Sequence, residues 1–278
     1  NVRGLWRRTT PASYNTGAPQ WETVLDVDAL AKSENANWVW SGAYCPSPTF
    51  DRCLISLSDG GEDATVVREF DLPTRTFVTG GFNFPKGKQD ISMLDRDTAL
   101  VAREWEPGTM TESGYAFVVK SLRRGQPLSA AVEIYRGLVT DVGVSPLVMH
   151  DADGHTVALI VRNIDFYNSE VRLITPEGLK KLLLPAKSTI QGFVDNTLIF
   201  TIQEDWTFNG KTYKSGSLLG VLPEERELVD GERRAVSSHE ACVGVARATA
   251  LGDALGSGAG DEPRRDLVGP RGGFAAEA

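Results

Sequence analysis

The sequence lacks the features that mark several protein classes. It has no run of about 18 apolar residues, the length that a membrane-spanning helix needs. Three cysteines are too few for a disulfide framework. Acidic residues outnumber basic ones by 37 to 29, and the net charge of -8 argues against a general nucleic-acid or anionic-membrane binder. Hydrophobic residues make up 41%, so the composition is that of an ordinary globular protein.

Catalytic motifs are missing as well. A nucleophile elbow needs Gly-x-Ser-x-Gly, because a strained turn between strand and helix must expose the hydroxyl group. The nearest match, residues 143–147, lacks the last glycine and places Pro146 after Ser145, so we interpret Ser145 as a strand residue. The phosphate-binding Gly-x-x-x-x-Gly-Lys-Ser/Thr motif is absent. His239 lies beside an atypical C-terminal region and is a poor candidate for a general base.

Residues 150–155 bring two histidines and two aspartates together, which could suggest a metal site. The sequence has no second cluster that would supply the remaining ligands, and an Asp-rich turn between two strands explains the same residues. We therefore predict no metal and no cofactor, and we assign no catalytic, cofactor-binding or metal-binding residue.

The sequence does contain a repeated strand-turn-strand pattern. Residues 93–101 pair an apolar arm with a β-rich arm across an acidic turn, as in a tight hairpin. Residues 193–200 repeat this pattern, residues 148–160 have it with a longer turn, and residues 49–56 are a fainter copy. The second arms start near positions 53, 98, 156 and 197. The steps of about 45, 58 and 41 residues are typical of propeller blades.

We therefore predict an all-β fold, a β-propeller of four-stranded blades with about five blades in residues 1–223. A partial unit comes first, and the following units are expected at about 38–78, 90–135, 141–185 and 190–222. Residues 224–278 are an irregular Ala/Gly-rich tail, which we expect to be disordered or weakly helical around 243–255.

The cysteines and the amino terminus bear on the compartment. Cys45 and Cys53 flank a turn, so a disulfide is conceivable in an oxidising compartment, and the alternative is two small half-buried residues. Cys242 has no visible partner. Residues 1–8 lack an initiating Met and the basic-then-apolar order of a signal peptide. We expect a cytoplasmic rather than a periplasmic protein.

Several segments, in the same order along the chain, resemble the propeller of bacterial prolyl oligopeptidases, serine peptidase family S9. These segments are residues 3–10, 21–30, 37–40, 52–61, 67–71, 111–115 and 205–219. The resemblance covers about residues 1–223. It implies a seven-bladed propeller that caps an α/β-hydrolase domain and restricts access to small substrates, and an activity that cleaves short peptides after proline.

The chain departs from the plan that this resemblance implies. The nucleophile, acid and histidine of the family belong to the hydrolase domain, which we expect to be absent here. The chain is expected to begin inside the first blade and to stop after about five blades. An incomplete ring exposes apolar sheet faces, so we predict that the isolated chain is unstable or aggregation-prone.

Three functional hypotheses follow. The first is the substrate-gating propeller portion of a prolyl-oligopeptidase-like serine endopeptidase. On this hypothesis the chain is inactive alone, and its partners are short peptides and the α/β-hydrolase domain of the same polypeptide. The second is a non-catalytic propeller that binds peptide or protein partners through its loop face. The third is a non-functional truncated fragment.

Two long loops supply the candidates for tunnel or domain-interface residues, because long ordered loops on a rigid scaffold often carry function. The candidates are Trp105, Thr111, Ser113, Tyr115, Trp206 and Tyr213. The first hypothesis places these loops against a hydrolase domain, and the second requires them to form a finished pocket alone. A simpler alternative for the aromatic candidates is that they fill the core or brace the loops.

Overall fold

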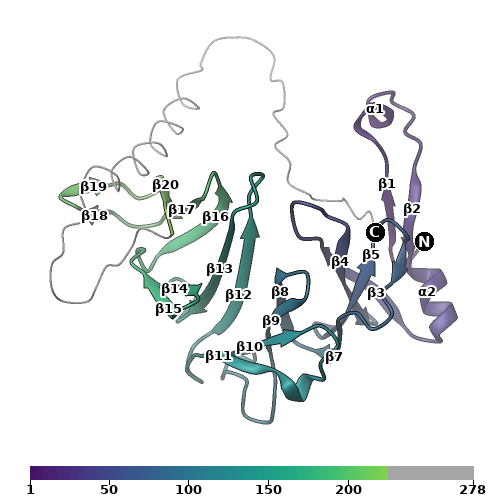
Figure 1. The fold of residues 1–278 in the computed structure, drawn as a ribbon, viewed down its shortest axis with the longest axis horizontal. Coiled ribbons are helices and arrows are strands. Elements are labelled where there is room, and N and C mark those ends of the chain that lie inside the picture. Colours follow the sequence, from purple (N-terminus) through teal and green to yellow (C-terminus); the bar gives the residue numbers. More distant parts are fainter. Residues whose placement is uncertain (224–278) are drawn as a thin grey trace. The chain divides into compact units, whose positions relative to one another are not determined.

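The computed structural model describes residues 1–223 of the 278-residue chain (Figure 1). They fall into two compact units, which divide between Lys88 and Gln89. Within this range no helix is long and apolar enough to cross a membrane. The predicted tail, Cys242 and His239 lie outside the described residues.

The first unit begins with a two-stranded ribbon and a helix. Its elements are β1 (Leu5–Arg8), α1 (Pro11–Tyr14), β2 (Glu22–Asp26) and α2 (Val27–Glu34). The Asp26 carboxylate caps α2 by accepting a hydrogen bond from the Ala29 N–H at 3.0 Å, and Asn35 ends the helix in the left-handed conformation. With both of its ends capped, α2 extends over eight residues.

A sheet follows in the first unit. Its strands are β3 (Trp38–Tyr44), β4 (Arg52–Asp59), β5 (Thr65–Asp71), β6 (Thr76–Phe77) and β7 (Asn83–Gly87). β3, β4 and β5 pair in sequence order, and β6 and β7 both pair with the outer edge of β5. Its buried face packs Ile55, Leu57 and Phe70 against Trp6 of the ribbon. The four strands expected over residues 38–78 are confirmed, and β7 was not foreseen.

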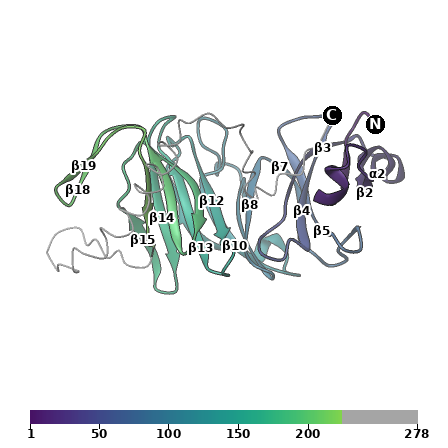
Figure 2. The same cartoon turned by 90° about the horizontal axis from the view of Figure 1, so that it is seen from above.

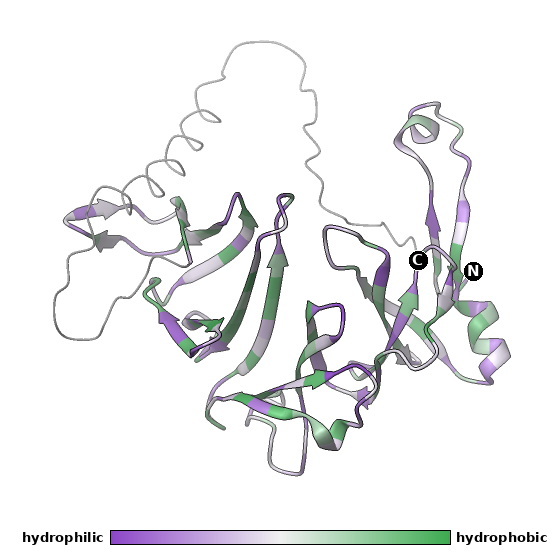
Figure 3. Cartoon of the chain, in the orientation of Figure 1, coloured by the Kyte–Doolittle hydropathy of each residue, from purple (hydrophilic) through white to green (hydrophobic). Residues whose placement is uncertain are grey.

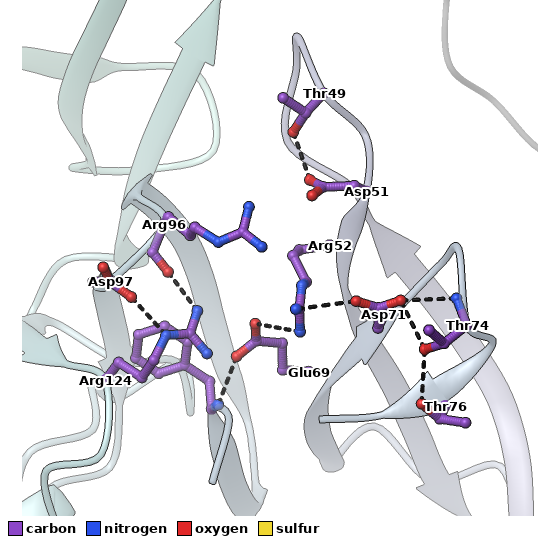
Figure 4. A network of polar contacts seen from close by, with 11 residues as sticks. Thr49, Asp51, Arg52, Glu69, Asp71, Thr74, Thr76, Arg96, Asp97 and Arg124 are labelled. Atoms are coloured by element: carbon purple, nitrogen blue, oxygen red, sulfur yellow. Dashed lines mark hydrogen bonds and ion pairs between the residues drawn. The ribbon is translucent and has the colours of Figure 1, made fainter. Parts of the chain in front are cut away.

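Polar contacts and a disulfide join the strands of this sheet. Arg52 on β4 lies 3.0 Å from the Asp71 carboxylate on β5, and Asp71 also accepts a hydrogen bond from the Thr74 N–H at 2.8 Å (Figure 4). This second bond closes the turn between β5 and β6. Cys45 and Cys53 form a disulfide across the connection from β3 to β4, which is the first of the two alternatives left open by the sequence.

The second unit contains three antiparallel sheets. The first has β8 (Gln89–Asp95), β9 (Thr98–Arg103), β10 (Val118–Arg123) and β11 (Val132–Arg136), with the 3-10 helix η1 (Leu128–Ala130) before β11. The middle sheet has β12 (Gly143–His150), β13 (Thr156–Asn163), β14 (Ser169–Thr175) and β15 (Gly178–Leu182). The last sheet has β16 (Ser188–Val194), β17 (Thr197–Ile202) and β20 (Leu218–Val221), with the ribbon of β18 (Trp206–Phe208) and β19 (Lys211–Tyr213) between β17 and β20.

The repeat seen in the sequence is the repeat of the structure. The second arms, expected near residues 53, 98, 156 and 197, are the second strands β4, β9, β13 and β17 of the four larger sheets. The β1–β2 ribbon is the incomplete unit that precedes them. The predicted all-β fold of sheet repeats is confirmed.

The core of the second unit lies between its sheets. Along β13, Val157 and Leu159 pack against the last sheet, whereas Ala158 and Ile160 pack against the first sheet. Alternate residues of a strand point to opposite faces, so both faces of the middle sheet are buried. Figure 2 shows its strands side by side, and Figure 3 shows hydrophobic residues along β12 and β13. Stacked sheets of this kind give a rigid scaffold.

Because the strands run up and down in order, the second unit has two kinds of strand ends. Connections at what we call the loop end are residues 104–117, 137–142, 164–168, 183–187 and 203–217. Connections at what we call the turn end are residues 96–97, 124–131, 151–155, 176–177 and 195–196. At the turn end, Arg124 closes the first sheet by donating hydrogen bonds to the Asp97 carboxylate and to the Arg96 carbonyl (Figure 4).

Candidate functional site

Exposed apolar side chains gather at the loop end of the second unit. Six of them define what we call the loop-end surface: Tyr115, Leu138, Val139, Ile164, Phe166 and Tyr167. They come from three successive connections, and their exposed fractions range from 39% for Ile164 to 84% for Phe166. Exposed apolar side chains on neighbouring connections are candidates for a binding surface.

The first connection, residues 104–117, is folded around Thr111. The Thr111 side chain is buried, accepts a hydrogen bond from the Tyr115 N–H at 3.2 Å and donates one to the Val142 carbonyl at 3.1 Å. The Thr111 N–H donates to the Tyr115 carbonyl at 2.8 Å. Ser113 lies exposed at the tip, and Tyr115 is 55% exposed. Thr111 therefore acts as the internal brace that presents Tyr115.

Trp105 braces the base of the same connection. Its indole N–H donates to the Val118 carbonyl at 3.1 Å, and the Lys120 ammonium group lies 4.8 Å from the centre of its ring. The Thr109 hydroxyl accepts a hydrogen bond from the Trp105 N–H at 2.9 Å. These contacts fit the simpler alternative for Trp105, that of a loop brace.

Trp206 and Tyr213 lie in the last sheet's ribbon and pack inward. They are opposite each other on β18 and β19, with ring centres 6.0 Å apart, and Trp206 also stacks on Phe208 at 5.0 Å. Tyr213 is 8% exposed and belongs to the core cluster of the last two sheets. Of the six residues selected from the sequence, Ser113 and Tyr115 are therefore the ones exposed at the loop end.

The second connection, residues 137–142, is held by a buried ion pair. Both oxygens of the Asp141 carboxylate, whose side chain is 2% exposed, accept hydrogen bonds from the Arg162 guanidinium group at 2.8 Å. The Leu138 N–H donates to the same carboxylate at 2.7 Å. Burial raises the pKa of Asp141, but the Arg162 and Leu138 hydrogen bonds outweigh it, so this pKa is lowered.

Close packing around Gly137 keeps this connection in one conformation. A Cβ atom at Gly137 would lie 2.7 Å from an Asp141 carboxylate oxygen and 2.7 Å from a Val144 methyl group. Any larger residue would therefore push against the ion pair. The tip that carries Leu138 and Val139 is fixed by charge and packing rather than by burial of its own side chains.

The third connection, residues 164–168, is a tight turn built on Asp165. One carboxylate oxygen accepts from the Tyr167 and Asn168 N–H groups at 2.8 Å, and the other accepts from the Asn168 side chain at 2.7 Å. The side-chain hydrogen bond from Asn168, followed by the two N–H bonds, lowers the pKa of Asp165. The turn leaves Phe166 and Tyr167 84% and 74% exposed, and both residues line a pocket beside the turn.

A pocket of about 300 Å³ lies beside this turn, between the middle and last sheets. Apolar residues Leu147, Val161, Val171 and Ile190 line it together with neutral polar residues such as Asn163, Ser188 and Gln203. Among the described residues that line the pocket, Asp165 is the charged one, and none is basic. The pocket suits neutral, partly apolar groups.

Backbone hydrogen bonds link neighbouring connections of the loop end, or the strand residues Asn163 and Ser169 that flank the third connection. They run from the Glu112 N–H to the Val139 carbonyl, Val142 to Asn163, Ser169 to Ala186, and Gln203 to Lys187, at 2.8 to 2.9 Å. These hydrogen bonds hold neighbouring connections of the loop end next to one another.

Two other candidates from the sequence have structural roles. Ser145 lies on β12, and its hydroxyl donates to the Asp90 carboxylate at 2.7 Å, which confirms its interpretation as a strand residue.

Residues 151–155 form the β12–β13 turn, as expected. Asp151, Asp153 and His155 place atoms that could bind a metal within 4.8 Å of one another. The Asp151 carboxylate, however, already accepts hydrogen bonds from the N–H groups of its own turn and of Asn196.

Sequence comparison decides the family. Residues 1–209 match the model of the prolyl oligopeptidase N-terminal β-propeller domain. The chain belongs to this family. The resemblance inferred from the ordered segments is therefore confirmed, and the sheets described above are blades of a prolyl oligopeptidase propeller.

Relatives of this propeller are longer proteins. This chain is 45% identical over 226 residues to the uncharacterized peptidase y4nA of Sinorhizobium fredii. The match covers 79% of this chain and 31% of that protein. The chain is 27% identical to the uncharacterized peptidase RP174 of Rickettsia prowazekii, covering 80% of this chain and 32% of that protein. The structure of a post-proline cleaving enzyme from Rickettsia typhi matches with a TM-score of 0.73 and 27% identity, covering 79% of this chain and 34% of that one. The propeller chain spans about a third of the length of these relatives.

Proposed function

We propose that this propeller gates substrate access in a prolyl-oligopeptidase-like serine endopeptidase that cleaves short proline-containing peptides. We also propose that its loop-end surface contacts the catalytic α/β-hydrolase domain of the same polypeptide. The observation that supports this most directly is the set of exposed apolar side chains that includes Phe166 and Tyr167. Exposing such side chains to water is unfavourable, so a surface that fixes them outward suits a partner that covers them.

The division of labour follows from the residues. The sequence contains no Gly-x-Ser-x-Gly motif. The nearest approach is Ser145, which lies on a strand and donates a hydrogen bond to the Asp90 carboxylate. A triad would have to come from the remainder of a longer polypeptide, in line with relatives about three times as long. The propeller alone is expected to be inactive.

Gating needs a rim that stays in place. The loop end meets this need because internal hydrogen bonds fix each connection. Buried Thr111 and Asp141 make them in the first and second connections, and exposed Asp165 makes them in the third. A rigid rim against a hydrolase domain excludes large or folded substrates, whereas short peptides can pass. Proline specificity would then be set by the hydrolase pocket.

The test compares a surface variant with a matched control in a full-length peptidase that carries this propeller. Phe166→Ser with Tyr167→Ser removes two exposed aromatic side chains at the loop end, and Val132→Ser with Val194→Ser removes two exposed aliphatic ones, 63% and 57% exposed, elsewhere. We expect the loop-end pair to lower kcat/KM for a chromogenic Gly-Pro substrate at least tenfold, and the control pair to change it less than twofold, because loss of an interface aromatic costs about 1 to 2 kcal/mol. Equal effects of the two pairs would refute the assignment of the surface, and turnover by the propeller chain alone would refute the absence of a triad.

The cytoplasmic location is a separate proposal. It requires Cys45 and Cys53, which the structure joins, to be reduced thiols in the cell, since cytosolic thiols are kept reduced. Alkylation of the protein in intact cells, followed by mass spectrometry, tests this. Two alkylated cysteines support the cytoplasm, and two protected cysteines contradict it.

A further inference from the structure

A buried carboxylate lies at the turn end, away from the loop-end surface. Asp151 belongs to the β12–β13 turn, and its side chain is 1% exposed. The Asp153 and His155 N–H groups donate to one of its oxygens at 3.0 and 2.9 Å. These two hydrogen bonds close the turn on itself.

The other oxygen of Asp151 reaches the neighbouring sheet. It accepts a hydrogen bond from the Asn196 N–H at 2.9 Å, and Asn196 lies in the β16–β17 turn. Asn196 and its neighbour Asp195 both have positive φ values, as in the tight two-residue turn of a β-hairpin. One carboxylate therefore joins the turns of the middle and last sheets.

His155 connects this buried group to solvent. Its Nδ1 lies 2.7 Å from the same Asp151 oxygen that accepts from Asn196, and its side chain is 47% exposed. The hydrogen bond to Asp151 raises the pKa of His155, and the carboxylates of Asp151, Asp153 and Asp195 raise it further. Burial raises the pKa of Asp151, but hydrogen bonds from Asn196, His155 and Asp153 outweigh it and hold this pKa at about 2.

We propose that Asp151 and His155 form a proton-operated latch between the middle and last sheets of the second unit. With a proton on both ring nitrogens, His155 forms an ion pair with Asp151 and orients the oxygen that holds Asn196. When His155 loses that proton, the ion pair becomes a weaker neutral hydrogen bond. The contact between the two turns then loosens, while the loop-end surface keeps its own hydrogen bonds.

The latch is independent of the proposed peptidase function, because it concerns a contact within the propeller that can be measured without turnover. His150 provides an internal reference beside it. Its Nδ1 lies 2.8 Å from the Thr156 hydroxyl, and burial lowers its pKa, although Asp151 opposes this. The two neighbouring histidines are thus expected to titrate on opposite sides of the ordinary value of 6.5.

The test is a pH titration of the isotope-labelled chain by NMR from pH 5 to 9, following the Asn196 amide and both histidine rings. We expect the Asn196 amide shift to follow the His155 ring, with a midpoint above 6.5. We also expect the Asn196 amide opening constant, corrected for intrinsic exchange, to rise about fivefold across that midpoint, the size expected of a partly exposed ion pair.

Two variants make the assignment specific. His155→Gln keeps a side-chain donor that cannot titrate, so the pH response of Asn196 should disappear, whereas His150→Gln should leave it unchanged. Asp153→Asn removes one neighbouring charge and should lower the midpoints of His155 and Asn196 together. The proposal is wrong if Asn196 does not respond to pH in the unmodified chain, if the response survives in His155→Gln, or if the two midpoints in Asp153→Asn separate.

Discussion

The two ends of the second unit solve the same problem in different ways. Both must hold connections between strands in place with few buried apolar side chains. At the loop end, the connections fix themselves from within through Thr111, Asp141 and Asp165, and turn apolar side chains outward. At the turn end, charged side chains such as Arg124 and Asp151 tie the turns together. The large exposed hydrophobics near these turns, Val132 and Val194, lie at the ends of strands rather than in the turns.

On the proposed function, this difference separates a surface that a partner domain covers from one that faces water. An outward apolar side chain contributes little to folding, and the proposed function accounts for its fixed exposure by a partner that covers it. Charged side chains in the turns, in contrast, are stabilised by hydration and by weak ion pairs with one another. Substitutions of the bracing residues at the loop end should therefore lower stability, whereas substitutions of its exposed residues should weaken association.

The largest expected effect comes from the buried brace at the loop end. Asp141→Asn leaves the Arg162 guanidinium group without its bidentate carboxylate, and loss of one partner of a buried ion pair costs about 3 kcal/mol. Denaturant unfolding measures this change in the free energy of unfolding. Asp153→Asn, an exposed turn-end residue, is the matched control and should stay within about 0.5 kcal/mol. A loss below about 1 kcal/mol for Asp141→Asn would mean that the brace is not needed.

A smaller effect is expected for the turn-end carboxylate. In Asp151→Asn an amide NH₂ group replaces the oxygen that accepts from the Asn196 N–H and faces His155 Nδ1. The hydrogen bond from Asn196 is then lost, because two donors face each other. The melting temperature should fall, but by less than in Asp141→Asn. The pKa of His155 should also return toward 6.5, which NMR titration of the ring measures. A His155 pKa that stays raised in the variant would exclude Asp151 as the cause.

The pH dependence of stability follows from the same groups and is smaller still. His155 has a raised pKa in the folded state, so its contribution is fully present below 6.5 and is lost as the pH rises through the folded value. Asp151 has a lowered pKa, so its contribution is present above 3.8 and is lost as the pH falls toward about 2. Melting curves from pH 2 to 9 should therefore show a decline at each extreme. A melting temperature that keeps rising between pH 6.5 and 9 would contradict the His155 part.

The smallest stability effect is expected at the loop-end surface itself. Phe166→Ser with Tyr167→Ser should change the free energy of unfolding by no more than about 0.5 kcal/mol, because both side chains are largely exposed. Binding of a hydrophobic fluorescent dye should nevertheless fall, and Val132→Ser with Val194→Ser should lower it less. Strong destabilisation by the aromatic pair would show that Phe166 and Tyr167 are packed, and the contrast between the two ends would fail.

Much of the fold follows from local sequence patterns. Apolar arms around short acidic turns place the second strand of each larger sheet at positions 53, 98, 156 and 197, because hairpin pairing is local. β7 was missed because Phe84-Pro85-Lys86 does not read as a strand, and its pairing with β5 depends on a partner distant in sequence. The resemblance to prolyl oligopeptidases added the fold family, which periodicity alone does not identify.

The site was harder to predict than the fold. Tyr115 and Ser113 lie at the loop end, but Tyr213 belongs to the core and half-buried Trp206 packs against it. The sequence does not distinguish them, because aromatic residues occur both in cores and in exposed loops. The missed residues are Leu138, Val139, Ile164, Phe166 and Tyr167. Their signal was present, because apolar residues in short connections beside Asp or Asn violate the usual polarity of turns. That two such connections lie side by side depends on how the sheets stack.

Hydrogen exchange measured by mass spectrometry on a full-length peptidase that carries this propeller, beside the propeller chain alone, tests the central claim most directly. We predict that residues 111–116, 137–142 and 164–168 exchange more slowly in the full-length protein, while residues 151–155 and 195–196 exchange at the same rate in both. Slower exchange at the turn end, with no change in the three loop-end segments, would contradict the assignment of the loop-end surface as the site of the hydrolase domain.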